Sequence, residues 1–192
     1  ANGLTVAWEY IVPSPEFDVA QAVGLMVTKP VDAYFPAIGP THMAQVAGGA
    51  FQQGLTPLSM MAAPSFNDAF VREGFALAPL FTSGSMYLMA FVAPYEAETA
   101  GHATMRATFT AMGIDSANTF LVAGWSSQHH LKGVLEAANK GGDLTRAGIR
   151  RAAGSVYVDS DGMMPQRELG QNRADAESFI AVPDGTIASG VK

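Results

Sequence analysis

The 192-residue chain contains no cysteine and few charged side chains. The absence of cysteine excludes disulfide bonds, thiolate metal sites and a cysteine nucleophile together. Charged residues make up 15% of the sequence, the formal net charge is −6, and the 11 basic residues are scattered apart from Arg150 and Arg151. Nucleic acid is therefore not an expected partner, because its binding depends on clustered Lys and Arg side chains that contact phosphates.

The sequence also lacks a long hydrophobic run. No window reaches the roughly 18 consecutive apolar residues that a membrane-spanning helix requires, although 48% of all residues are apolar. The first residues, ANGLTVAWEY, lead straight into a strand-like pattern. We therefore expect any export signal to have been removed or to lie outside this sequence. At this length, one large domain or two small ones are expected.

The first part of the chain alternates between strand-like and helix-like segments. Strands are predicted at 4–11, 31–35, 58–61 and 75–81, and helices between Asp18 and Pro30, between Thr41 and Gly54, and near 67–73. Asp18 and Thr41 are expected to cap their helices, and Gly54 suits a left-handed residue after a helix end. The run at 31–35 is nearly all apolar, as in strands buried on both faces. This alternation predicts an α/β fold with a doubly wound parallel sheet.

From Thr82 onward the pattern changes to longer helices. Helices are predicted at 95–112, 118–138 and 145–154, and short strands at 156–158 and 179–182. Thr145 is expected to cap the last of these helices. Gly residues at 113 and 141–142 are expected to end the first two.

Patterns for nucleotide binding and nucleophilic catalysis are missing. A phosphate-binding loop needs backbone N–H groups after the first strand, but residues 12–16 contain two prolines and an acid. The stretches GWSSQ (124–128) and TSGSM (82–86) do not match the G-x-S-x-G motif of serine hydrolases. We therefore predict no catalytic residue and no cofactor, and a protein that binds its target without transforming it.

Two stretches invite a metal-site hypothesis, and both fail on geometry. His129 and His130 are neighbours on a predicted helix, so their side chains point about 100° apart and do not share an ion. The turn 159–162 resembles the start of a calcium loop, but the twelfth position, which needs a Glu, is Gly170. No metal site is predicted.

Two uncharged loops follow the second and third predicted strands, at 37–41 and 62–66. Ligands of parallel α/β sheets bind outside the carboxyl ends of the strands, where helix N-termini present free N–H groups. The residues expected to bind a ligand are Ile38 and Phe66 as apolar walls, Gly39 and Ala63 for close backbone approach, and Thr41 and Ser65 as donors. For each residue taken alone, a role in a tight turn is an open alternative.

Several weak motifs occur in a recognisable order. Phe17-Asp18-Val19 starts a helix, and Pro30-Val31-Asp32-Ala33 enters a strand. Further on come GGDLTRAGIRRAAG (141–154) and VDSDGMM (158–164). This order, over residues 4–190, resembles the second lobe of type I periplasmic substrate-binding proteins of the branched-chain amino acid (Leu/Ile/Val) ABC-transporter family.

The resemblance implies a Venus-flytrap fold and the carboxyl-terminal part of a protein roughly twice as long. Residues 1–81 would form most of the second ligand-binding lobe. Residues 82–155 would be a helical segment of the first lobe, whose amino-terminal part is missing, and 156–192 the return crossing and terminal strands. Chain crossings are expected at 75–82 and 156–161, with Phe81, Thr82 and Ser83 as a hinge. The surface left by the missing lobe would favour homo-oligomers.

The resemblance also implies a function. The chain would be the extracytoplasmic solute-binding component of an ABC importer, periplasmic or extracellular, with a lipid anchor in some full-length forms and a membrane permease as partner. The expected ligand is an amino acid, an amide or a small carboxylate. Leu/Ile/Val binders carry an acidic residue in the loop after the third strand, but residues 61–64 are uncharged, which argues against a ligand with an ammonium group. Two alternatives stay open: a sensor domain with the same fold, and an α/β enzyme of unrecognised chemistry.

Overall fold

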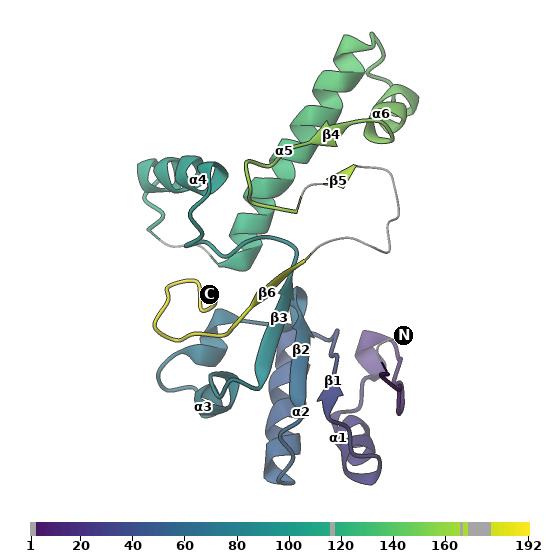
Figure 1. Ribbon diagram of the computed structural model, residues 1–192, viewed down its shortest axis with the longest axis vertical. Helices are drawn as coiled ribbons and strands as arrows, with labels where there is room; N and C mark the ends of the chain where they lie inside the picture. The colour runs from purple at the N-terminus through teal and green to yellow at the C-terminus, as the bar shows by residue number, and fades with distance from the viewer. Residues whose placement is uncertain (1–2, 116–117, 166, 169–177) are drawn as a thin grey trace. The chain divides into compact units, whose positions relative to one another are not determined.

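The computed structural model describes residues 3–115, 118–165, 167–168 and 178–192. The chain forms two compact units, residues 1–89 with 180–192 and residues 90–179. Figure 1 labels the helices and strands of both. Among the helices in these ranges, none has the length and apolar character needed to cross a membrane.

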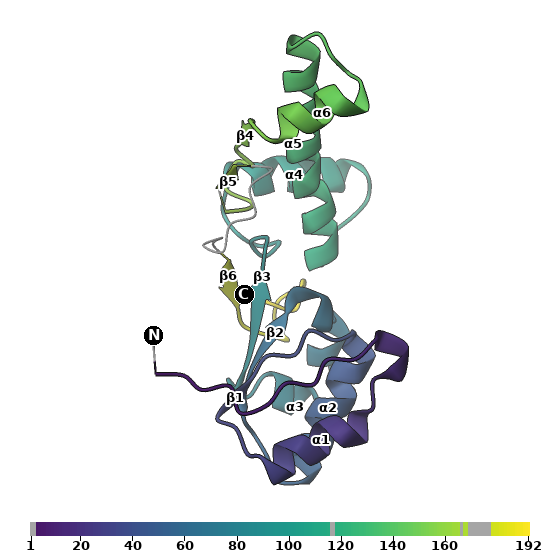
Figure 2. The same cartoon turned by 90° about the vertical axis from the view of Figure 1, so that its right-hand side faces the viewer.

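The first unit is built on a four-stranded sheet. Its strands lie in the order β1 (Ala33–Tyr34), β2 (Leu58–Ala62), β3 (Met86–Ala90) and β6 (Phe179–Ala181). β2 pairs in parallel with both β1 and β3. The helices are α1 (Val19–Thr28), α2 (Pro40–Gln52) and α3 (Ala78–Phe81), with 3-10 turns η1 (Ser14–Glu16), η2 (Ala63–Ser65) and η3 (Asp68–Val71). α1, α2 and α3 lie on one face of the sheet (Figure 2). The predicted parallel α/β sheet is confirmed.

The two long helices of this unit follow from local sequence signals. Asp18 caps α1 by accepting hydrogen bonds from the N–H groups of Ala20 and Gln21, and Pro30 follows the C-cap. α2 ends at Gln52, and Gly54 follows its C-cap with a φ of +73°, which is strained for any residue with a Cβ. The N–H of Leu55 then donates to the carbonyl of Ala50 and satisfies one of the last helix carbonyls.

The core of the first unit lies on the helix-covered face of the sheet. Alternate strand residues are buried there, in keeping with the two-residue period of a strand: Tyr34, Ser59, Met61, Met86 and Leu88. The facing helices bury Ala22, Met26, Met43, Val46, Ala47 and Ala50. Phe35 was expected in a strand buried on both faces, but β1 ends before it and its side chain is 67% exposed.

The strand predicted at 4–11 is wrong. This segment pairs with none of the described strands, and Leu4, Val6 and Ile11 are exposed. Its contacts include two hydrogen bonds of aromatic side chains: Trp8 Nε1 donates to the Lys29 carbonyl at 3.1 Å, and the Tyr10 hydroxyl accepts from the Asp18 N–H at 3.1 Å. β-branched and aromatic residues favour an extended backbone, but a strand forms only where a neighbour pairs with it.

The strand predicted at 75–81 is also wrong. Residues 78–81 form α3, and the strand lies further along the chain as β3. An apolar run alone does not distinguish a buried strand from a buried helix. Pro79 decides the outcome, because it lacks the N–H that an interior strand requires and is well tolerated in the first turn of a helix.

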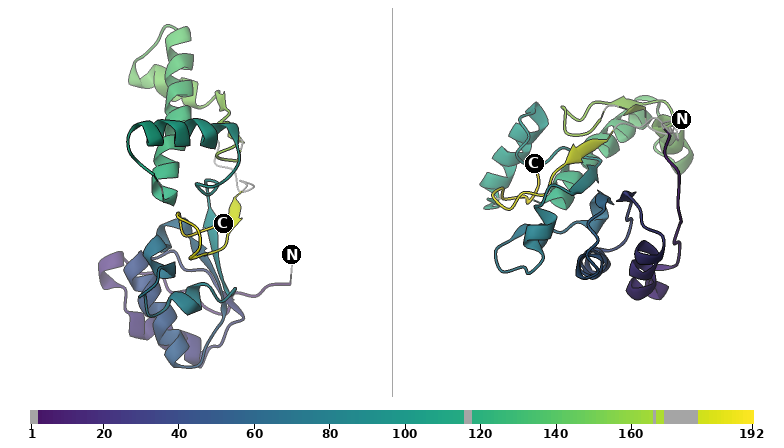
Figure 3. Two further views of the ribbon diagram at one scale, coloured as in Figure 1. Left: turned by 90° about the vertical axis from the view of Figure 1, so that its left-hand side faces the viewer. Right: turned by 60° about the horizontal axis from the view of Figure 1, so that its bottom comes forward.

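Over its described residues, the second unit contains three helices and a two-stranded sheet (Figure 3, left). The helices are α4 (Ala100–Ala111), α5 (Thr119–Lys140) and α6 (Arg146–Ala153), capped by the side chains of Thr99, Asn118 and Thr145. The helix predicted from residue 95 starts later because Thr99 is its cap and residues 94–97 form a turn. β4 (Tyr157–Val158) pairs antiparallel with β5 (Arg167–Glu168). The strand predicted at 156–158 is therefore present as β4, and its partner is a strand of the same unit.

The chain passes between the two units at Met89–Ala90 and returns at Phe179–Ile180. The crossings expected at 75–82 and 156–161 thus lie elsewhere. β4 belongs to the second unit because its partner strand is β5, and 75–82 belongs to the first because it contains α3. The core of the second unit is built around Val92, Met105, Phe109, Val122 and Met163.

The imidazole of His102 is buried in the second unit. Burial lowers the pKa of His102 below its ordinary value, although the carbonyls of Ala93 and Pro94 oppose the shift. Because the folded pKa lies below the unfolded value of about 6.5, stability is full above that pH and falls as the pH drops through it. We predict that the free energy of unfolding decreases between pH 7.5 and 5.5, by less than about 1.4 kcal/mol per pH unit.

Urea titrations at several pH values measure this effect. His102→Gln should flatten the dependence in this range, whereas the control His129→Gln, on the surface of α5, should keep it. An equal pH slope in wild type and His102→Gln would contradict the assignment.

Candidate ligand-binding site

Loops 37–41 and 62–66 lie side by side at the carboxyl ends of β1 and β2. The hydroxyl of Ser65 accepts a hydrogen bond from the Ile38 N–H at 3.1 Å and donates one to the Pro36 carbonyl at 3.3 Å. The N–H of Ala62 also donates to the Pro36 carbonyl, at 3.0 Å. The two loops that the sequence singles out are therefore joined on one rim of the sheet.

The structure divides the six predicted site residues into two groups. Ala63, Ser65 and Phe66 are buried. The Phe66 ring packs edge-on against Phe70, with ring centres 6.0 Å apart. The Ser65 hydroxyl already holds the two loops together, so it is a structural group and not a free donor.

The other three predicted residues, Ile38, Gly39 and Thr41, lie at the start of α2. The expectation that Thr41 caps this helix is wrong, because Gly39 is the N-cap and Pro40 the first helical residue. The fixed φ of proline suits that first position. Gly39 has no side chain that could cap the helix, and Thr41 is exposed in the first turn. The N-terminus of α2 thus presents backbone N–H groups and the positive end of the helix dipole at this rim.

Three aromatic side chains beside α2 were not predicted as site residues. The Phe17 ring stacks at a tilt on His42, with ring centres 5.1 Å apart, and on Tyr10 at 5.4 Å. All three side chains are half-buried. Phe17 immediately precedes the cap of α1, and no spacing in the sequence connects it to His42. This aromatic row supplies an apolar surface next to the first turn of α2.

Few charged or titratable groups contribute to the electrostatics of the rim. Loops 37–41 and 62–66 carry no charged residue. Asp18, which follows Phe17, uses its carboxylate to cap α1. Burial raises the pKa of Tyr34, at the end of β1, so this hydroxyl is neutral at physiological pH. The helix dipole of α2 is then the main electrostatic feature here, and it favours an anionic or carbonyl group.

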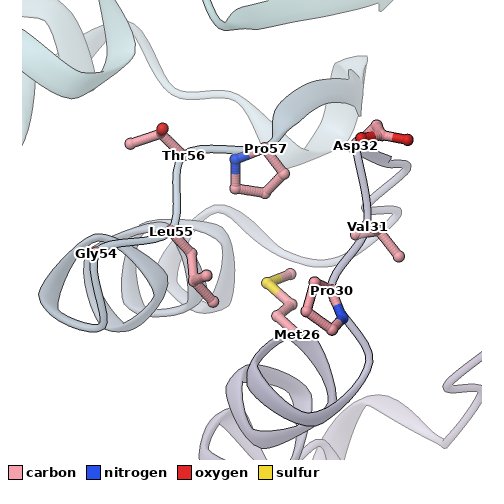
Figure 4. Close-up of a pocket in the computed structure, with 8 residues that line it drawn as sticks. All are labelled: Met26, Pro30, Val31, Asp32, Gly54, Leu55, Thr56 and Pro57. Atoms are coloured by element: carbon pink, nitrogen blue, oxygen red, sulfur yellow. The ribbon is translucent and has the colours of Figure 1, made fainter.

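A depression of about 330 Å³ lies at the opposite end of the strands. It is lined by residues that precede β1 and β2 (Figure 4): Met26, Pro30, Val31, Asp32, Gly54, Leu55, Thr56 and Pro57. The two prolines offer no N–H donor. α1 and α2 end here, so the depression meets helix carbonyls and the Asp32 carboxylate. This environment disfavours an anionic ligand, and the α2 rim is the better site for one.

The motifs rejected at the level of the sequence lie on ordinary structural elements. His129, His130 and GWSSQ (124–128) are part of α5. Asp161, with a φ of +52°, and Gly162 form the turn after β4. Within the described ranges, no three His, Asp or Glu side chains are grouped so that they could hold a metal ion.

The predicted hinge residues lie inside the first unit. Phe81 is fully buried at the end of α3. The hydroxyl of Thr82 donates to the Ala78 carbonyl and that of Ser83 to the Leu80 carbonyl, both within the same turn. These contacts fix the end of a helix seven residues before the chain leaves the unit at Met89.

The solved structures that share this fold include two ABC transporter substrate-binding proteins. A fatty acid ABC transporter substrate-binding protein from Thermomonospora curvata superposes with a TM-score of 0.75 at 21% identity, over 92% of this chain and 46% of that one. An ABC transporter substrate-binding protein from Aeropyrum pernix gives a TM-score of 0.64 at 14% identity, over 91% and 47%. The chain thus spans about half the length of the structures it matches. No protein-family model and no curated protein matches the sequence.

Removal of the Ser65 hydroxyl should loosen the rim. We predict that Ser65→Ala lowers the free energy of unfolding by about 1–3 kcal/mol, because the Ile38 N–H and the Pro36 carbonyl lose a buried partner. Thermal or urea unfolding measures the loss. Thr5→Ala, which removes the hydroxyl of an exposed residue of the same unit, is the control and should change stability by less than about 0.5 kcal/mol. Equal effects of the two substitutions would show that the Ser65 hydroxyl does not join the loops.

Proposed function

We propose that this chain is part of the solute-binding component of an ABC importer, working outside the cytoplasm and delivering its ligand to a membrane permease. The observation that carries the proposal is an uncapped helix N-terminus on an uncharged strand rim, in a chain with the fold of substrate-binding proteins over 92% of its length. Such a rim holds a polar group through backbone N–H donors without any covalent chemistry. Ligand release then requires only that weak contacts break.

We further propose that the ligand is a carboxylate or an amide with an apolar body. The N–H groups at the start of α2 would receive the polar group, with Thr41 beside them and Gly39 leaving the backbone open. Ile38, Phe17 and His42 would contact the apolar part. Ala63, Ser65 and Phe66 would support the rim from within. The fold neighbour from T. curvata is a fatty acid ABC transporter substrate-binding protein, and a fatty acid combines a carboxylate with an apolar body.

An α-amino acid fits this rim less well. Its ammonium group would lose water on binding and find no carboxylate in loops 37–41 and 62–66. An unpaired buried ammonium costs several kcal/mol. The proposed ligand class therefore differs from that of the Leu/Ile/Val family suggested by the motif order.

Matched ligand pairs test the ligand class. We predict that 4-methylpentanoate and octanoate raise the melting temperature of the protein more than leucine and 2-aminooctanoate do at equal concentration, since binding to the folded state alone stabilises it. Dialysis with the recovered ligand analysed for chemical change would show that it is returned unaltered. Preference for the amino acids would reject the carboxylate class, and turnover would reject a binding function.

A charge placed on the rim tests the position of the site. We predict that Ile38→Glu abolishes the response to the acids, because a carboxylate beside the α2 N-terminus repels theirs and occupies the same N–H groups. Thr56→Glu, in the depression at the other end of the strands, is the control and should leave the response intact. If Thr56→Glu removes the response and Ile38→Glu does not, the ligand binds at the other end.

A further inference from the structure

The aromatic row beside α2, formed by Tyr10, Phe17 and His42, lies outside the core of the first unit. Its neighbouring ring centres are 5.4 and 5.1 Å apart, with ring planes tilted by 43° and 38°. All three side chains are half-buried, so each of them keeps an exposed part. A second group of contacting rings in the same unit is instead buried in its core: Phe66, Phe70 and Phe81.

The rings of the aromatic row stand on backbone that local contacts hold in place. Tyr10 belongs to the extended segment 4–11, and its hydroxyl accepts a hydrogen bond from the Asp18 N–H at 3.1 Å. Phe17 directly precedes Asp18, whose carboxylate caps α1. His42 lies in the first turn of α2. Because these positions are fixed before a ligand arrives, binding on the row costs little ordering of the protein.

His42 connects the aromatic row to the polar end of the site. Pro40 has no N–H, and the N–H of Met43 donates to the Gly39 carbonyl at 2.9 Å. Within the described ranges, the N–H groups of Thr41 and His42 have no acceptor in the protein. A carboxylate held by the His42 N–H therefore lies close to the imidazole of the same residue. A short linker is then enough to bring the body of the ligand onto the row.

Aromatic rings attract one another by more than the apolar area that they bury. Offset and edge-to-face pairs are favoured at ring-centre distances of about 4.5–7 Å, and both contacts within the row fall in this range. A further ring supplied by a ligand extends the row in the same way. A saturated ring of the same size buries a similar area but lacks the charge distribution of an aromatic ring. The difference corresponds to about twofold to tenfold in affinity.

We propose that the ligand of this site is an aromatic carboxylate. Its ring packs on the aromatic row, and its carboxylate accepts hydrogen bonds from the N–H groups of Thr41 and His42. This inference rests on the proposed function and narrows its ligand class from acids with an apolar body to acids with an aromatic ring. A short carbon linker between the ring and the carboxylate, as in phenylacetate, suits a row that begins at the residue whose N–H holds the carboxylate.

Phenylacetate and cyclohexylacetate test the preference, because they share the carboxylate and the linker and have rings of similar size. Isothermal titration calorimetry should show tighter binding of phenylacetate by about twofold to tenfold. NMR should show ring-current shifts at the Phe17 and His42 rings with phenylacetate and much smaller shifts with cyclohexylacetate. Equal affinities for the two acids would overturn this inference and leave the proposed function standing. If neither of them nor 4-methylpentanoate binds, the proposed function itself is rejected.

Ring substitutions test whether the aromatic row carries the preference. Phe17→Leu keeps an apolar side chain but removes a ring, so the ratio of the two affinities should fall to about one. His42→Leu should have the same effect and serves as the test if circular dichroism shows that Phe17→Leu is unfolded. Phe51→Leu is the control, since Phe51 is 54% exposed and lies at the other end of α2, and it should keep the wild-type ratio. Folded Phe17→Leu and His42→Leu variants that retain the full preference would overturn the proposal.

Discussion

The bond between Ser65 and the loop after β1 is the contact on which the rest of the rim depends. One buried hydroxyl receives the Ile38 N–H and reaches the Pro36 carbonyl, so the ends of two neighbouring strands are held together from inside. The chain then turns at Gly39 and starts α2 directly at the rim, with Pro40 in the first helical position. Because no side chain caps this helix, its N–H groups and dipole point to the surface beside the aromatic row. The buried hydrogen bonds of Ser65 thus hold the uncharged, polar rim in place.

Much of this architecture can be read from local signals in the sequence. Asp18, Thr145 and Gly54 mark helix ends because each acts within one turn of chain, through a side-chain oxygen or a positive φ. The pairing of two uncharged loops on one rim follows from the parallel connection of β1 and β2. These features need only nearby residues or the regular geometry of a sheet.

The features that sequence reasoning missed depend on distant partners. Residues 4–11 have the composition of a strand but pair with none of the strands that the structure describes, and they form an extended segment held by Trp8 and Tyr10. The aromatic row joins Phe17 to His42 across 25 positions, and no period in the sequence predicts that contact. From the sequence alone, Ser65 cannot be distinguished from an exposed serine that donates to a ligand. Only its burial in the structure shows that its hydroxyl bonds within the protein. The local sequence predicts that a loop is polar and uncharged, whereas packing against distant residues determines which of its side chains are exposed.

The proposed function depends on the start of α2 receiving the polar group of a small ligand. Amide NMR spectra of the ¹⁵N-labelled protein, recorded while 4-methylpentanoate is added, test this claim most directly. We predict that the largest shifts occur at the N–H groups of Thr41 and His42, with smaller ones at Ile38. Shifts centred on Gly54 and Asp32, at the other end of the strands, would contradict it.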